Sequence, residues 1–251
     1  MKTIDKALSD LKRNGYSVLN EYFDKDFCKK AIEEINDYIN LKDSKVITNR
    51  HENVSGDYRM FGFEKVSETA RKFKNDNFIN SIIKKITNYK HSSHFILAGK
   101  LEFETGIHKN SGGGWHRDSD KEQFKYMVYL NDVDEKGGPF LFLKNSDNFD
   151  LPRRIRQNKM SFIENILFFF NKIKKNPPRY ENQVIENDIH KKSNLKEIIG
   201  KAGTVVIFDS TYIHRGKNIE YGSRYTFTNY IYKKSIASKI MRKRQFKKLL
   251  I

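Results

Sequence analysis

The triplet His116-Arg117-Asp118 has the residue types and the spacing of a metal-binding pair. In an extended chain residues i and i+2 point to the same face, so the His116 imidazole and the Asp118 carboxylate can meet at one point. Taken alone the triplet is a weak signal, because such triplets arise by chance and also form ordinary surface pairs. Its setting strengthens it, since it follows the glycines at 112–114 and precedes a strand-like stretch.

A second histidine, His214, follows much later within the strand-like run TVVIFDSTYIHRG. Two imidazoles and one carboxylate on one side of a ferrous ion leave coordination positions open, as oxygen chemistry on non-haem iron requires. The three residues His116, Asp118 and His214 are therefore the candidate metal ligands and catalytic residues. Considered by itself, His214 is equally consistent with a hydrogen-bonded histidine of the core.

Arg224 lies ten residues beyond His214, and the intervening NIEYGS has the composition of a turn. The spacing predicts that His214 and Arg224 occupy neighbouring strands of a hairpin. A guanidinium offers a planar fork, so Arg224 is a candidate clamp for the far carboxylate of a dicarboxylic cosubstrate. Thr226 shares its face and adds a hydroxyl. Arg215 competes for any anion, but alternation points it to the face opposite His214.

Other polar residues near these positions have weaker claims. Trp115 and Arg117 flank His116 and are candidates for lining the substrate pocket, although a packing role suits Trp115 equally well. Asp120 and Asp209 are reserve carboxylates, which turns and strand ends explain more simply. The remaining histidines are expected to face solvent: His51, His91, His94, His108 and His190.

The elements that must position these side chains are mainly strands. From Phe95 onward strand-like runs alternate with tight turns, as in FILAGKLEFE, FKYMVYLNDV, GTVVIFD and SRYTFTNYIY. This order predicts a mainly β protein with flanking α-helices, whose core is an antiparallel sandwich or barrel of the jelly-roll kind. Upstream, apolar residues at helical spacing predict one helix from Asp24 and another from about Asp76.

The net charge of +17 is concentrated in two segments. Residues 151–201 carry 12 basic and 5 acidic side chains, and residues 233–251 carry 8 basic and no acidic ones. We interpret 147–200 as a basic insertion in a jelly-roll core of residues 95–232. A helical and strand support (1–94) precedes the core and a basic tail follows it, so that residues 1–251 form one domain. Such segments attract nucleic acid, a membrane surface or an acidic substrate, although a solvated tail explains the last segment equally well.

Composition also bounds the cellular setting. The single cysteine, Cys28, excludes an intramolecular disulfide and a cysteine-based zinc cluster, and a reducing interior is the natural expectation. The start, MKTIDKALSD, has no apolar core of a signal peptide, and the longest aliphatic or aromatic run is Ile166 to Phe170. We expect a cytoplasmic protein, with peripheral membrane contact through the basic segments as the alternative.

On these residues the sequence resembles the phytanoyl-CoA dioxygenase-like family of Fe(II)/2-oxoglutarate oxygenases. The resemblance rests on His116-x-Asp118, His214 and Arg224, with YLNDVDEKGGPFLFLKNS between, and on the N-terminal NGYSVLNEYFDKDFCKKAIEEINDYI. It implies a cupin-like double-stranded β-helix with Fe(II) on the two histidines and the aspartate, and 2-oxoglutarate on the arginine. It also implies that O2 and 2-oxoglutarate are consumed, that succinate and CO2 are released, and that the substrate is hydroxylated. The carboxylate of Asp118 disfavours halogenation.

Three features depart from the pattern of that family. The tripeptide Asn-Ser-Asp at 145–147 stands where a Gly-Ser-His-like turn is usual. In that family, residues upstream of the H-x-D triplet also contact the cosubstrate, and they have no clear counterpart in this sequence. Lys100 is the candidate for this role. Nucleic-acid demethylases of the superfamily carry a second arginine shortly after the first, whereas no arginine lies between Arg224 and Arg242. This argues against a nucleobase substrate.

Two functions of different classes follow from these observations. The first is a dioxygenase that hydroxylates a small or medium, polar or anionic substrate, such as a surface-carbohydrate precursor or an acyl-type metabolite, under a basic lid. The second is a non-catalytic jelly-roll module that binds a polyanion, such as an acidic glycan, a membrane surface or nucleic acid. Dependence on iron separates the two. The sequence predicts no oligomeric state.

Overall fold

The computed structural model describes residues 3–41, 47–50, 56–87, 91–105, 114–118, 122–144, 146, 156–157, 179–180 and 194–233. Most of the predicted basic insertion and nearly all of the basic tail lie outside these ranges. The predictions for Asp120, His51, His108 and His190 also lie outside them, as do the side chains of His91 and His94.

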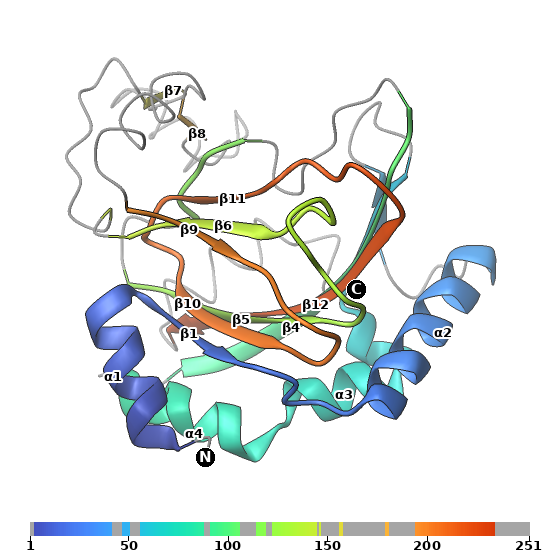
Figure 1. Ribbon diagram of the computed structural model, residues 1–251. Coiled ribbons are helices and arrows are strands. Elements are labelled where there is room, and N and C mark those ends of the chain that lie inside the picture. The colour runs from blue at the N-terminus through green and yellow to red at the C-terminus, as the bar shows by residue number, and fades with distance from the viewer. Residues whose placement is uncertain are drawn as a thin grey trace, which may run out of the picture.

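Two antiparallel sheets face each other in the jelly-roll, double-stranded β-helix arrangement that the sequence predicts (Figure 1). The smaller sheet has the strand order β11-β6-β9 and the larger the order β1-β10-β5-β12-β4-β3-β2, while β7 and β8 form a separate pair. The strands of the smaller sheet are β6 (Phe140–Leu143), β9 (Leu195–Ile198) and β11 (His214–Gly216). Those of the larger sheet are β1 (Tyr16–Leu19), β2 (Ile47–Arg50), β3 (Asp57–Phe61), β4 (His91–Glu102), β5 (Phe124–Tyr129), β10 (Val205–Asp209) and β12 (Ser223–Lys233). The separate pair is β7 (Arg156–Gln157) and β8 (Arg179–Tyr180).

Strand β9 corrects one predicted boundary. It lies within the predicted insertion 147–200, yet it pairs antiparallel with β6, from Phe140 opposite Ile198 to Leu143 opposite Leu195. Its first two residues are exposed, so its short sequence LKEI lacks the apolar alternation that would have identified a core strand. Leu195–Ile198 therefore belong to the smaller sheet and not to the predicted insertion.

In the described part of the chain, four helices and one 3-10 turn accompany the sheets, and the helices cover one face of the larger sheet (Figure 1). They are α1 (Ile4–Asn14), α2 (Lys25–Leu41), η1 (Phe63–Lys65), α3 (Glu68–Lys74) and α4 (Asn77–Ile86). None of the described helices combines the length and the apolar character needed to cross a bilayer.

The two helices predicted from the sequence are confirmed as α2 and α4. Each begins beside an aspartate whose carboxylate accepts a backbone hydrogen bond, from Phe27 N to Asp24 at 2.7 Å and from Ile79 N to Asp76 at 2.9 Å. These bonds satisfy donors that the first helical turn leaves without an intrahelical partner. Helices α1 and α3 were not predicted from the sequence.

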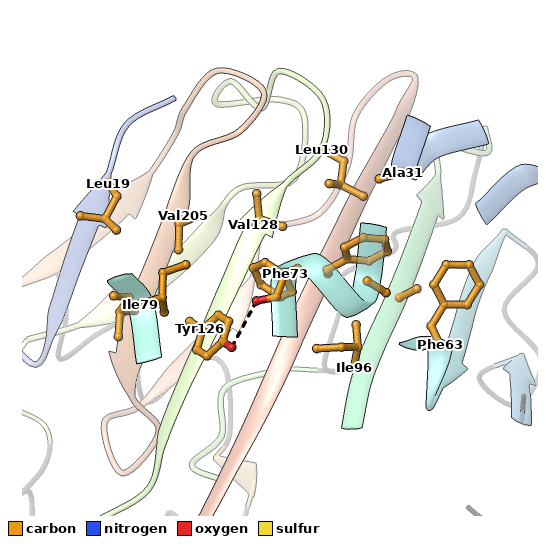
Figure 2. Close-up of a cluster of buried hydrophobic side chains, with 14 of the residues drawn as sticks. Leu19, Ala31, Phe63, Phe73, Ile79, Ile96, Tyr126, Val128, Leu130 and Val205 are labelled. Atoms are coloured by element: carbon orange, nitrogen blue, oxygen red, sulfur yellow. Dashed lines mark hydrogen bonds between the residues drawn. The ribbon is translucent and has the colours of Figure 1, made fainter. Parts of the chain in front are cut away.

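The main core lies between the helices and the larger sheet. Figure 2 shows Phe73 of α3 and Ile79 of α4 packed against side chains of β5, among them Tyr126 and Val128. Burying a large apolar side chain contributes about 1.5–3 kcal/mol, so this layer fixes the helices to the sheet. Because side chains alternate along a strand, residues such as Met127 and Tyr129 face the smaller sheet instead.

The inner faces of the two sheets enclose a second apolar cluster and a pocket. The cluster includes Tyr129, Phe140, Phe142, Val206 and Phe208. Phe140 and Phe208 also border the pocket, so the cluster forms part of its wall.

Gly203 allows a close approach between the chain before β10 and the segment before α2. Its carbonyl oxygen accepts hydrogen bonds from Tyr22 N at 2.9 Å and Phe23 N at 3.2 Å. Its φ is +84°, and a Cβ atom at this position would lie 1.9 Å from the carbonyl oxygen of Phe23. We expect Gly203→Ala to lower the free energy of unfolding by about 3 kcal/mol or more, because the backbone must move apart.

The matched control for this prediction is Gly222→Ala. Gly222 has a φ of +61°, but a Cβ there would meet no atom within 4 Å. We therefore expect Gly222→Ala to lower the free energy of unfolding only by the strain of the left-handed backbone, about 1–2 kcal/mol. Denaturant unfolding of the two variants measures the difference, and equal losses would show that the contact with Phe23 is unimportant.

Candidate active site

The side chains of His116, Asp118 and His214 meet between the two sheets. One potential ligand atom from each lies within 4.8 Å of the others. Main-chain hydrogen bonds bring them together: His116 and His214 exchange N–H···O bonds of 3.0 Å, and Asp118 N donates to the carbonyl oxygen of Ser210 at 3.0 Å. Backbone pairing thus places the three side chains at one point, as the sequence predicts.

Both imidazoles are oriented by carbonyl groups of the main chain. Nδ1 of His116 lies 2.8 Å from the oxygen of Gly114, and Nδ1 of His214 lies 2.8 Å from the oxygen of Tyr212. A carbonyl only accepts hydrogen bonds, so each Nδ1 carries a proton, and each Nε2 is the ring nitrogen that faces Asp118. This is the tautomer that a metal-binding histidine needs.

The three facing atoms fit a cation. Nε2 of His214 lies 3.0 Å from Oδ2 of Asp118, and Nε2 of His116 lies 3.9 Å from Oδ1. Two imidazoles with one carboxylate match the donor set of non-haem ferrous iron.

The Asp118 carboxylate lies beside the ammonium group of Lys125, with Nζ 2.7 Å from Oδ2. Burial alone would raise the pKa of Asp118, but Lys125 together with His214 and His116 holds that pKa well below its usual range. No hydrogen bond of regular geometry reaches Oδ2 from a described residue. The short ionic contact nevertheless decides its charge, so Asp118 is ionised at neutral pH, as a ligand must be.

Arg224 borders the same pocket as the three candidate ligands. Its side chain is buried, and Nη1 donates to the carbonyl oxygen of Gly138. Its Nε has no hydrogen-bond partner among the described residues. Thr226 follows on the same face and lies opposite Gly99 of β4, where a Cβ would come within 3.0 Å of the Thr226 hydroxyl. The missing side chain at Gly99 leaves room in front of that hydroxyl.

The predicted hairpin between His214 and Arg224 is wrong. Strand β11 pairs with β6 in the smaller sheet, whereas β12 pairs with β4 and β5 in the larger sheet. Residues 217–222 therefore carry the chain from one sheet to the other. The two side chains still border one pocket because they lie on facing sheets, and turn composition does not distinguish such a crossing from a hairpin.

The location of Lys100 does not support its assignment as a cosubstrate ligand. Although Lys100 borders the pocket, its Nζ lies 2.7 Å from Oε1 of Glu102. The same ammonium lies 5.8 Å from the ring centroid of Tyr58 and 5.5 Å from that of Tyr225. Lys100 pairs with Tyr225 in the sheet, one residue away from the pocket-facing pair of Gly99 and Thr226, so its side chain points to the opposite face.

Arg59 on β3 is a pocket residue that the sequence analysis missed. It pairs with Gly99 of β4 and so shares the inner face of the sheet. Asp57 holds its guanidinium through two contacts, Nε to Oδ1 at 3.1 Å and Nη2 to Oδ2 at 2.7 Å. Nothing in the local sequence distinguished this arginine, because its position depends on the pairing of β3 with β4.

Lys125 is the second missed residue. It is 4% exposed, and its Nζ lies 3.9 Å from the ring centroid of Tyr230, which pairs with it across β5 and β12. A local signal was present, since alternation in FKYMVYL places Lys125 on the face of Met127 and Tyr129. A lysine on a strand face otherwise made of large apolar residues indicates a charged partner.

The flanking residues have other positions than the sequence suggested. Trp115 is 1% exposed and is not among the described residues that border the pocket, nor is Arg117, which donates to the carbonyl oxygen of Ser146. Arg215 is among the residues that border the pocket, but it pairs with Leu141, next to the inward-facing pair of His214 and Phe142, and so lies on the opposite face of β11, as alternation predicts. Its guanidinium carbon lies 4.8 Å from the Trp115 ring centroid. Asp209 accepts local hydrogen bonds at the end of β10, as its simpler interpretation required.

Comparison with known proteins gives one family match and several similar structures. A model of the phytanoyl-CoA dioxygenase family matches residues 11–220. Comparison with curated protein sequences gives no match. Among solved structures, SnoN, a non-heme alpha ketoglutarate dependent epimerase from nogalamycin biosynthesis, has 11% identity and a TM-score of 0.66, with 92% of this chain and 80% of SnoN covered.

Two further structures share the fold. HygX from Streptomyces hygroscopicus, solved with nickel and 2-oxoglutarate, has 12% identity and a TM-score of 0.62, with 94% of this chain and 89% of HygX covered. A prolyl-4-hydroxylase from Pseudomonas putida has 12% identity and a TM-score of 0.57, with 93% of this chain and 100% of the other covered. At such identities the structural likeness establishes the fold alone.

Proposed function

The chain belongs to the phytanoyl-CoA dioxygenase family, and on this premise we propose that it hydroxylates a small or medium, polar or anionic substrate with release of succinate and CO2. Residues 1–251 form one oxygenase domain in this proposal. His116, Asp118 and His214 hold ferrous iron, and Arg224 with Thr226 binds the far carboxylate of 2-oxoglutarate. The observation that carries the proposal is the convergence of three ligand atoms beside a buried arginine in one pocket.

Each side chain has a distinct task in this reaction. When bound, ferrous iron and 2-oxoglutarate supply the means to activate O2 and oxidise a C–H bond. The carbonyl groups of Gly114 and Tyr212 keep both Nε2 atoms unprotonated and aimed at the pocket. Phe140 and Phe208 pack against the His214 ring, each with a centroid distance of 5.4 Å, and so exclude water from that side.

Arg59 takes over the task that the sequence analysis gave to Lys100. Its guanidinium borders the pocket on the same sheet as Arg224, in the row next to it. Because Asp57 holds two of its N–H groups, the fork is fixed in direction before any anion binds. We propose that Arg59 is the second cation that 2-oxoglutarate meets.

The charges around the pocket favour an anionic primary substrate. By strand register, three cationic side chains, of Arg59, Lys125 and Arg224, face it together with the carboxylates of Asp57 and Asp118, which leaves one positive charge in excess. A divalent metal and a doubly charged cosubstrate cancel each other, so the excess remains for the substrate. This supports an acidic sugar precursor or an acyl-type metabolite over a neutral compound.

The similar structures support a small-molecule substrate. SnoN has been solved in complex with Fe3+, alpha ketoglutarate and nogalamycin RO, and HygX with nickel, 2-oxoglutarate and hygromycin B. The alternative of a polyanion-binding module depends on basic segments that lie mostly outside the described residues. The pocket gives that alternative no specific support.

Succinate release from labelled 2-oxoglutarate, with and without ferrous iron, tests the proposed reaction. The substrate panel pairs each anionic compound with its neutral counterpart, for example a sugar acid with its parent sugar. We expect iron-dependent succinate formation that the anionic members stimulate more strongly. Absence of iron-dependent turnover across the panel, with iron-independent binding of a polyanion that high salt abolishes, would favour the binding module instead.

A further inference from the structure

Lys125 is a buried cation that the proposed reaction does not yet use. Its side chain is 5% exposed, and its Nζ is 2.7 Å from Oδ2 of Asp118. On either side along the sheet it pairs with Phe208 of β10 and Tyr230 of β12, so that aromatic rings flank it. Tyr230 lies against the ammonium itself. The carboxylate that its ammonium group contacts is that of Asp118.

The contact engages only one of the two carboxylate oxygens. Both oxygens lie near candidate ligand atoms, since Oδ2 is 3.0 Å from Nε2 of His214 and Oδ1 is 3.9 Å from Nε2 of His116. Lys125 contacts Oδ2. A carboxylate with both oxygens available can bind a metal through both, and each additional bond uses a position that a chelating cosubstrate or O2 requires. Because Lys125 is held in place by strand β5, its ammonium group on Oδ2 restricts the carboxylate to binding the metal through one oxygen.

Resting on the proposed function, we propose that Lys125 is a positioning residue that keeps one oxygen of Asp118 engaged and leaves only the other for the metal. The same ammonium compensates the carboxylate when no metal is present and repels a metal when one is bound. Lys125 thereby lowers the affinity of the site for the metal. It also keeps coordination positions open for 2-oxoglutarate.

This role predicts opposite effects on metal and cosubstrate in Lys125→Met, which keeps the length of the side chain and removes the charge. Affinity for ferrous iron should rise about tenfold, since the repulsion and the competition for Oδ2 are both gone, and partners of metal ligands act on this scale. Affinity for 2-oxoglutarate should fall about tenfold, since a position is used by the second oxygen. Lys125→Arg keeps the cation and should recover most of both values.

The measurements are anaerobic titrations of the full-length protein with ferrous iron and then with 2-oxoglutarate. Metal content reports the first, and the visible charge-transfer band of a chelated 2-oxoacid reports the second. Thermal unfolding with and without metal shows whether each variant is folded. The matched control is Lys74→Met, because Lys74 is also partly buried and lies 2.6 Å from Oε1 of Glu64, outside the pocket. It should leave both affinities unchanged.

The outcomes separate this inference from the proposed function. Tighter iron with weaker 2-oxoglutarate in Lys125→Met, but not in Lys74→Met, supports it. Unchanged or weaker iron binding in folded Lys125→Met, or a Lys125→Arg protein that behaves like Lys125→Met, overturns it while the oxygenase assignment stands. A wild-type protein that binds neither iron nor 2-oxoglutarate overturns both.

Discussion

Iron-dependent succinate formation is expected to fall by at least about a hundredfold in His116→Ala, because the change removes a metal ligand and even partners of ligands matter by 10–100-fold. The fold should persist. His116 pairs with His214 through main-chain atoms, with two N–H···O bonds of 3.0 Å, and alanine keeps both. The measurement is labelled succinate per bound iron, together with the iron content of the purified protein.

Two further proteins make this experiment decisive. The double variant His116→Ala/His214→Ala should lose no more activity than either single variant, because residues that act as a unit are not additive. His51→Ala is the control, since the sequence predicts that this histidine faces solvent. Wild-type rates of iron-dependent succinate formation in His116→Ala would show that the metal is held elsewhere.

The KM for 2-oxoglutarate is expected to rise about 30-fold or more in Arg224→Met. Removing one partner of a buried, hydrogen-bonded charge pair costs about 2–5 kcal/mol, and 1.4 kcal/mol corresponds to a factor of ten. Iron affinity should stay near that of the wild type, because Arg224 approaches the pocket from β12 and is not among the three potential ligands. The ratio of the two effects identifies a cosubstrate residue.

Arg224→Lys and Arg13→Met complete the comparison. A lysine keeps the charge but offers no planar fork, so an intermediate KM is expected. Arg13 is an exposed arginine of α1 that contacts Asp10 at 3.4 Å, and its replacement should leave the KM unchanged. Because Arg224 also donates to the carbonyl oxygen of Gly138, thermal unfolding must accompany the kinetics. Equal KM values for wild-type protein and folded Arg224→Met would exclude the clamp.

The sequence by itself determined the residues that local spacing controls. His116 and Asp118 lie two apart in an extended segment and therefore share a face, whatever surrounds them. Asp24 and Asp76 precede apolar residues at helical spacing, and the helices begin there. His214 and Arg224 were proposed from their residue types and their places in strand-like runs, and these side chains border the same pocket as the pair.

Only the tertiary structure decided which strands pair and which faces look at each other. Arg59 faces the pocket because it pairs with Gly99 of β4, whose side of the sheet faces inward. Lys100 is the next residue of β4, so its side chain points to the other face. Strand β9 joins the core through its partner β6 rather than through its own apolar pattern. Each of these positions depends on hydrogen bonds between distant segments, and local alternation gives a residue's side of its own strand but not what that side will face.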